Sequence, residues 1–302
     1  MAPAVRNLTF HGYRYSCLVH EQPDPRLSPV VLLPGADQQA DAFGGPCRLM
    51  TRWATCVGID LPGGPGADPL PPRYGPGFLA DCVAHTIGEL GLGRVNLCGA
   101  SAATPVAYQA AVSHPEHVAR VALIGFMTTA PEETDAFERE AHELLTSGRT
   151  REWAGLMVRH LFCHDARRVV RGRSMLVKLF LRTYANSNRN DLARYRQMAE
   201  RFRLHRDWFP GVGLPQPALF FTGEHDRITP PEEARAAARL CADARTTTVK
   251  EADHMLFAER MPETVDLLTR FFSGESLEGL PYCGDVEYFG TGARPAAAMP
   301  GA

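Results

Sequence analysis

The chain has 302 residues, of which 45% are hydrophobic and 22% are charged, and its formal net charge is −2. Such a composition is typical of a globular protein with a large core, and the near-neutral charge gives no overall preference for nucleic acid or a membrane surface. No segment approaches the roughly 18 apolar residues that a membrane span needs, and the first residues do not read as a signal peptide. The eight cysteines are scattered without a C-x-x-C pair. We therefore expect reduced thiols, a cytoplasmic protein, and neither a metal nor a cofactor.

Short apolar runs alternate with helical patterns at both ends of the chain. Two antiparallel strands are predicted at 7–10 and 13–20, joined at His11-Gly12. Continuous apolar runs, which suit strands buried on both faces, then predict strands at 30–33, 55–61, 95–98, 118–126, 218–222 and 246–249. Helical patterns lie between them at 42–52, 78–90, 231–241 and 262–272. This alternation predicts an α/β fold with a mostly parallel sheet covered by helices on both faces.

The alternation stops in the middle of the chain. Residues 128–211 contain four helical patterns, at 132–147, 151–162, 173–184 and 192–208, and no strand pattern. We predict that they form a helical cap subdomain, inserted into a core domain built from residues 1–127 and 212–273. The remaining segment, 274–302, is rich in Gly, Pro and Ala, and we expect it to be a partly disordered tail, above all from residue 292 onward.

The sequence RVNLCGASAATPVAYQAAVS at 94–113 combines a short apolar strand, a tight turn and an immediate helix. This is the pattern of a nucleophile elbow, which holds one side chain alone at a strained apex. Ser101 is at the apex, and Gly99 supplies the small neighbour that the close approach of strand and helix requires. Ala103 stands where glycine is commoner, so the motif is G-x-S-x-A. Pro105 falls in the first helical turn, where a missing N–H is tolerated.

Three reactive residues follow predicted strands, in the order Ser101, Asp226 and His254. Parallel sheets place their ligand-binding loops at the carboxyl ends of strands, so we expect these side chains to meet. A serine hydroxyl needs a base to remove its proton, and the base needs a carboxylate to fix its tautomer. Ordinary loop or helix-cap roles are the alternative for each residue alone, but their order and placement together favour a catalytic triad.

The developing oxyanion of an acyl transfer needs backbone N–H donors. Ala102 follows the nucleophile at the start of its helix and supplies one donor. Ala36 follows the early strand and its Leu32-Leu33-Pro34-Gly35 turn, and we expect it to supply the other.

With these motifs in place, the chain resembles the α/β-hydrolase superfamily from about Val30 to Phe272. The resemblance rests on LLPG at 32–35, GIDLPG at 58–63, GASAA at 99–103, TGEHD at 222–226 and ADH at 252–254. It implies that Ser101 is the nucleophile, His254 the base and Asp226 the acid. Serine rather than aspartate at the elbow argues against epoxide hydrolases and haloalkane dehalogenases.

A finer resemblance concerns the substrate. The segment ARYRQMAERFRLH at 193–205, together with TGEHD and ADHMLF, is similar to the acyltransferase branch that takes 3-hydroxyacyl chains from acyl carrier protein. Enzymes of that branch make rhamnolipid precursors or pass the chain to coenzyme A. The resemblance implies an acyl-thioester substrate and an acyl carrier protein or coenzyme A as partner.

The predicted cap is strongly basic. Residues 149–206 contain 15 Arg or Lys and 4 Asp or Glu. Such a surface attracts a phosphopantetheine, a coenzyme A phosphate or an acidic carrier, and arginine forks grip phosphate well. We expect contacts at Arg167, Arg168, Arg171 and Arg173. The alternative is a solvated arginine-rich face with no ligand.

Three functions stay open at this point. The leading one is a serine hydrolase that cleaves a small-molecule ester or a thioester through an acyl-enzyme. The second uses the same intermediate but passes the acyl group to an acceptor other than water, a choice that depends on water exclusion. The third is a non-catalytic receptor on a hydrolase fold, which usually lacks a triad member, whereas this chain has all three.

Overall fold

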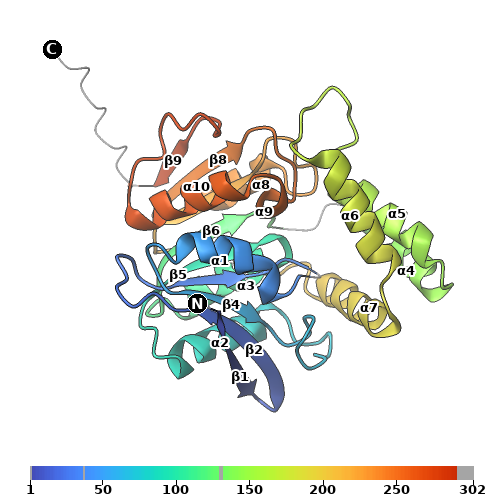
Figure 1. Cartoon of the computed structure of the whole chain (residues 1–302), viewed down its shortest axis with the longest axis horizontal. Helices are drawn as coiled ribbons and strands as arrows, with labels where there is room; N and C mark the ends of the chain where they lie inside the picture. Colours follow the sequence, from blue (N-terminus) through green and yellow to red (C-terminus); the bar gives the residue numbers. More distant parts are fainter. Residues whose placement is uncertain (1, 37, 129–131, 291–302) are drawn as a thin grey trace.

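The computed structural model describes residues 2–36, 38–128 and 132–290, and its centre is one twisted sheet (Figure 1). Within these residues the sheet has nine strands in the order β1-β2-β4-β3-β5-β6-β7-β8-β9. The six strands from β4 to β8 in this order are parallel, and antiparallel pairs lie at both edges. The strands are Ala4–Phe10 (β1), Tyr13–His20 (β2), Val30–Leu33 (β3), Cys56–Asp60 (β4), Val95–Ala100 (β5), Val118–Ile124 (β6), Ala218–Gly223 (β7), Asp243–Val249 (β8) and Glu287–Gly290 (β9). This confirms the predicted α/β class and its mostly parallel sheet.

Helices cover both faces of the sheet, because alternate residues of each buried strand point to opposite sides. In β3, Val31 and Leu33 belong to the cluster formed with α2, α3 and α8, whereas Val30 and Leu32 belong to the cluster formed with α1 and α10. A short helix, α9, follows the loop after β8. These elements are Ala40–Phe43 (η1), Gly44–Met50 (α1), Pro76–Glu89 (α2), Ser101–Ala103 (η2), Thr104–Ser113 (α3), Pro231–Ala238 (α8), Leu256–Glu259 (α9) and Met261–Ser273 (α10).

Four helices between β6 and β7 project to one side of the sheet (Figure 1). They are Glu132–Thr146 (α4), Thr150–Leu161 (α5), Arg173–Ala185 (α6) and Arg189–Leu204 (α7), and with their connecting loops we call them the cap. The cap has its own apolar cluster around the fully buried Trp153. Its last helix is fixed to the core by Arg201, whose guanidinium donates to the carbonyl oxygens of Leu70 (2.7 Å) and Tyr74 (3.0 Å). No helix in the described ranges is long and apolar enough to span a membrane.

Several boundaries differ from the sequence-based expectation; for example, β1 starts at Ala4 rather than at 7, and β8 starts at Asp243 rather than at 246. The last cap helix runs from 189 to 204 rather than from 192 to 208, because Asn188 caps it in a reciprocal capping box with Asp191. The segment 274–302 is not only a tail, because β9 pairs antiparallel with β8 and ends the sheet. The four residues of β9 are half-buried to exposed and lack an apolar alternation that would predict them. The disorder expected for 292–302 lies outside the described residues.

Candidate active site

The elbow around Ser101 has the geometry that its sequence predicts. Ser101 joins β5 to η2 and has a positive φ of 49°. A Cβ on Gly99 would lie 2.7 Å from both the Ala103 carbonyl oxygen and the Ala107 Cβ, so only glycine fits there. The atoms of Ala103 that lie closest to Gly99 are its backbone carbonyl atoms and not its side chain. For this reason an alanine is tolerated at position 103, where glycine is commoner.

The side chains of Ser101, His254 and Asp226 form one hydrogen-bonded chain. Ser101 Oγ lies 2.8 Å from His254 Nε2, and His254 Nδ1 lies 2.9 Å from Asp226 Oδ2. The serine comes from the end of β5, the aspartate from the loop after β7, and the histidine from the loop after β8. The fold thus brings together three residues that are 153 and 28 positions apart in sequence.

Asp226 is held by four donors besides the histidine. The backbone N–H groups of Ile228 and Thr229 donate to its Oδ1 at 2.9 and 3.0 Å. The hydroxyls of Thr222 and Thr229 donate to its Oδ2, the latter at 2.6 Å. These bonds fix both carboxylate oxygens, so the oxygen that faces His254 keeps one orientation.

The loops that carry Asp226 and His254 are joined by backbone contacts. The N–H of Glu224 donates to the carbonyl of Val249, and the N–H of His225 donates to that of Ala252, both at 2.9 Å. A Cβ on Gly223 would lie 2.1 Å from the Asp253 carbonyl oxygen, so the two loops meet without room for a side chain. The distance between Asp226 and His254 is therefore set by backbone contacts between their loops.

The two expected oxyanion donors come from η2 and from the loop after β3. Ala102 is in the first turn of η2, where N–H groups have no partner within the helix. Ala36 is in the loop after β3, and that loop packs against the elbow: a Cβ on Gly35 would lie 3.5 Å from Ser101 Cβ. Both residues therefore belong to segments that adjoin Ser101.

The charges of the site favour an ionised acid and a basic histidine. Burial alone would raise the pKa of Asp226, but the charge and hydrogen bond of His254 and the threonine hydroxyls outweigh it and lower this pKa to about 2. Burial alone would lower the pKa of His254, but the carboxylates of Asp226, Asp253 and Glu259 raise it above its usual 6.5. With Asp226 ionised, His254 carries its neutral-form proton on Nδ1, and Nε2 is free to accept the Ser101 proton.

Sequence reasoning missed several residues of this site. Thr222 is part of the TGEHD motif and Thr229 follows Asp226 by three positions, but the sequence pattern assigns neither of them a role. His160, in the last turn of α5, stacks on Phe137 with ring centroids 3.8 Å apart. Burial, with a smaller effect of the His254 charge, lowers the pKa of His160 to about 4. His160 thus places a neutral imidazole of the cap toward the site. Nothing in the local sequence indicates this position of His160.

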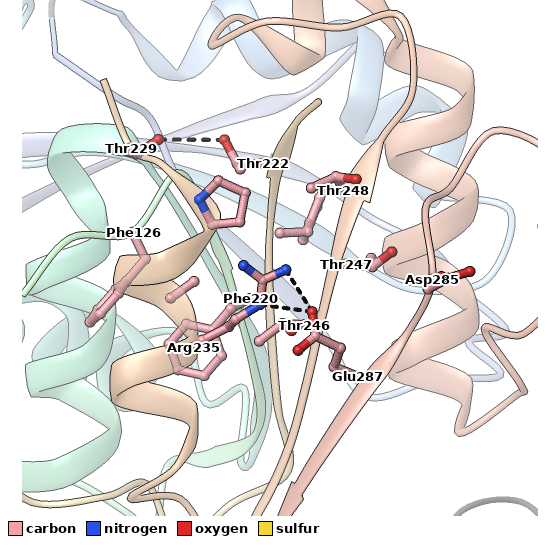
Figure 2. A pocket seen from close by; sticks show the side chains of 13 residues that line it. Phe126, Phe220, Thr222, Thr229, Arg235, Thr246, Thr247, Thr248, Asp285 and Glu287 are labelled. Carbon is pink, nitrogen blue, oxygen red and sulfur yellow. Dashed lines mark hydrogen bonds and ion pairs between the residues drawn. The ribbon is translucent and has the colours of Figure 1, made fainter. Parts of the chain in front are cut away.

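A cavity of about 230 Å³ lies between α8 and strands β7 and β8 (Figure 2). Thr222 and Thr229 line one end of it, and the Arg235–Glu287 ion pair lies across it at 2.7 Å. Neither Ser101 nor His254 lines this cavity. The cavity therefore adjoins the threonines that bind Asp226 and does not adjoin Ser101.

The four arginines expected to bind a carrier all have protein partners. Arg167 and Arg168 face the Asp165 carboxylate at 2.8 and 3.8 Å. Arg173 donates to backbone carbonyls of the same loop, and Arg171 pairs with Glu251 of the core at 2.7 Å. A carrier phosphate would have to compete with these partners.

No cluster of three or more potential metal ligands occurs among the residues that the structure describes. All eight cysteines are buried and free.

A sequence model of the alpha/beta hydrolase fold matches residues 48–260, and the chain belongs to this family. The matched range includes Ser101, Asp226 and His254. A comparison with curated proteins found none that matches this sequence.

Solved structures share the fold at low identity. An alpha/beta hydrolase enzyme from a Medee basin deep-sea metagenome library superposes with a TM-score of 0.76 at 14% identity, over 90% of this chain and 99% of that one. The enol-lactonase from Burkholderia xenovorans LB400 has a TM-score of 0.73 at 18% identity, over 89% and 100%. A thermophilic esterase from Thermogutta terrifontis has a TM-score of 0.71 at 20% identity, over 91% and 99%.

Proposed function

We propose that this protein is a serine hydrolase that cleaves an ester or a thioester through an acyl-enzyme. The observation that carries the proposal is the hydrogen-bonded chain from Ser101 through His254 to Asp226 at the carboxyl ends of three strands. Family membership supports hydrolase chemistry. The esterase and enol-lactonase among the structural neighbours favour a carboxylic ester or a related acyl compound.

In this mechanism Ser101 Oγ attacks the acyl carbon while its proton passes to His254 Nε2. The oxyanion is stabilised by the N–H groups of Ala36 and Ala102. His254 then returns the proton to the leaving alcohol or thiol, and the acyl group stays on Ser101. A water molecule then gives a proton to His254 Nε2 and attacks the acyl carbon. The bond from that carbon to Ser101 Oγ breaks, His254 returns the proton to Ser101 Oγ, and the acid is released.

The direct test is incubation with simple esters, acyl-coenzyme A and an acyl carrier protein, with mass detection of protein and products. An acyl adduct on Ser101 with release of free acid supports the hydrolase. Transfer of the acyl group to a hydroxy acid or to coenzyme A supports the acyltransferase. A protein that forms no adduct, and that no fluorophosphonate labels, is a binding module.

The basic cap favours one second candidate, an acyltransferase or thioesterase that receives its substrate on an anionic carrier. Arg167 is 90% exposed and Arg168 is 46% exposed, so both can reach a phosphate once released from Asp165. The acidic helix α4 reduces the positive charge on another side of the cap, where Glu140 lies 4.0 Å from Arg159. The loop at 167–168 is therefore the better candidate for a carrier contact.

For that candidate, we expect Arg167→Glu with Arg168→Glu to raise KM for carrier-bound substrate about tenfold, the lower end of charge-steering effects. The carrier-dependent rate should also fall with salt, since charges separated by about 8 Å are screened at physiological ionic strength. The matched control is Arg239→Glu on the exposed surface of the core. Equal effects on carrier-bound and small neutral substrates would contradict carrier recognition by this loop.

The pH dependence follows from the raised pKa of His254. The base must be neutral to accept a proton, so we expect kcat/KM for a small ester to rise with pH, with a midpoint above 6.5. Burial raises the pKa of the neighbouring Glu259 to about 7, so it titrates in the same range. The variant Glu259→Gln distinguishes the titration of His254 from that of Glu259. In this variant kcat/KM should still rise with pH, with its midpoint at a somewhat lower pH. If kcat/KM no longer rose with pH in this variant, the titrating group would be Glu259.

A further inference from the structure

The loop that carries His254 contacts both the cap and the core. Ala252 accepts a core hydrogen bond from His225, and His254 faces Asp226. Glu251 and Asp253 also bond to the cap, and Met255 packs against the apolar cluster of the cap. The base is thus placed between two residues that the cap holds.

Asp253 makes the first of these contacts from a buried position. Its carboxylate, in a residue that is 2% exposed, accepts the backbone N–H of Cys163, just after α5. Its own N–H donates to Glu259 at 2.6 Å. Asp253 therefore connects the end of a cap helix to the residue beside the base, and both ends of the connection are in the interior.

Glu251 makes the second contact. Its carbonyl accepts the N–H of Arg171 at 3.0 Å, and its carboxylate pairs with the Arg171 guanidinium at 2.7 Å. The same carboxylate accepts from Arg260 of the core at 3.1 Å. Glu251 has a positive φ of 54°, which is rare for a residue with a side chain and persists only where surrounding contacts hold it. One carboxylate thus joins the cap, the core and a strained turn.

We propose that Cys163–Asp253 and Arg171–Glu251 form a latch that positions His254, so that the base is in place only when this part of the cap is docked. This proposal rests on the proposed function, because it assigns Asp253 and Glu251 as positioning residues for that reaction. Another attachment of the cap, through Arg201, lies on the loop at 70–74 and does not touch the His254 loop. The latch is therefore a contact through which cap docking acts on the base.

The first test compares Asp253→Ala with Asp253→Asn. Both variants remove one negative charge near His254 and should shift its pH midpoint downward alike. Only Asp253→Asn keeps an oxygen that accepts the Cys163 N–H. At the pH optimum of each variant, we expect Asp253→Ala to react with a fluorophosphonate about 10²-fold more slowly, a usual cost of a small misplacement, and Asp253→Asn to stay within a few-fold of the original protein. Equal rates in the two variants would overturn the latch.

The second test uses Arg171→Glu, with Arg182→Glu as the matched control. Arg182 is an exposed arginine of the cap in α6, so its replacement makes the same charge reversal away from the latch. Because Arg171 and Glu251 are 57% and 43% exposed, we expect a drop in kcat of about fivefold with little change in KM for a small ester, and no drop in the control. Restoration of kcat by a second change, Glu251→Lys, would support the pairing, and equal effects of the two arginine variants would contradict it.

Hydrogen exchange at the Cys163 amide separates failure of the latch from failure of the proposed function. Exchange should be faster in Asp253→Ala than in Asp253→Asn, whether or not the protein hydrolyses any ester. Faster exchange with an unchanged labelling rate would mean that the cap contact exists but does not position His254. An original protein that no probe labels would contradict the hydrolase while leaving the contact intact.

Discussion

Replacing Ser101 by alanine is expected to lower kcat/KM for any ester or thioester substrate by about 10⁶, the loss typical of a triad whose members act as a unit. The variant loses the hydroxyl whose oxygen lies 2.8 Å from His254 Nε2. It keeps the elbow, because alanine at a φ of 49° has the same backbone restrictions as serine. Steady-state kinetics, intact-mass labelling with a fluorophosphonate, and thermal unfolding together check this expectation.

The matched control is Ser113→Ala at the end of α3, where the hydroxyl accepts a bond from Gln109 far from His254. It should keep both turnover and labelling. A fluorophosphonate adduct that persists in Ser101→Ala would show that the nucleophile has been wrongly assigned.

The sequence predicts the sheet and the triad candidates because both depend on short-range patterns. Strands such as Val30–Leu33 are buried on both faces and appear as unbroken apolar runs. The elbow is recognisable because Gly99, Ser101 and the following helix lie within a few residues, where steric limits are strict. Parallel strands place their carboxyl ends at one edge of the sheet, so residues just past strand ends are expected to meet.

Contacts between distant segments are what the sequence does not reveal. The basic composition of the cap predicts a ligand-binding face, yet Arg171 pairs with Glu251 across 80 positions. Such a pairing depends on how the cap packs against the loop after β8, and no local pattern encodes that packing. The same holds for β9, whose four residues pair with β8 only because the preceding turn returns them to the edge of the sheet.

Asp226→Asn should cost about 10⁴ in kcat/KM although it changes only one atom of the side chain. The Oδ1 site accepts two backbone N–H groups, from Ile228 and Thr229, which cannot reverse their polarity. The asparagine oxygen must therefore occupy that site, and its NH₂ group must face His254 Nδ1. The Thr222 and Thr229 hydroxyls can rotate to accept from the amide, so the fold remains intact.

A donor facing Nδ1 forces the His254 proton onto Nε2, the atom that must accept the proton of Ser101. The base is then in place but in the wrong tautomer, which lowers turnover while substrate affinity is retained. Nitrogen NMR of His254 should show the proton moved from Nδ1 to Nε2, and kinetics should show the loss in kcat rather than in KM. Glu224→Gln is the matched control, because its carboxylate bonds to the Glu251 N–H rather than to the histidine, and it should retain nearly full activity. If Glu224→Gln abolished turnover and Asp226→Asn did not, the carboxylate that orients His254 would be Glu224.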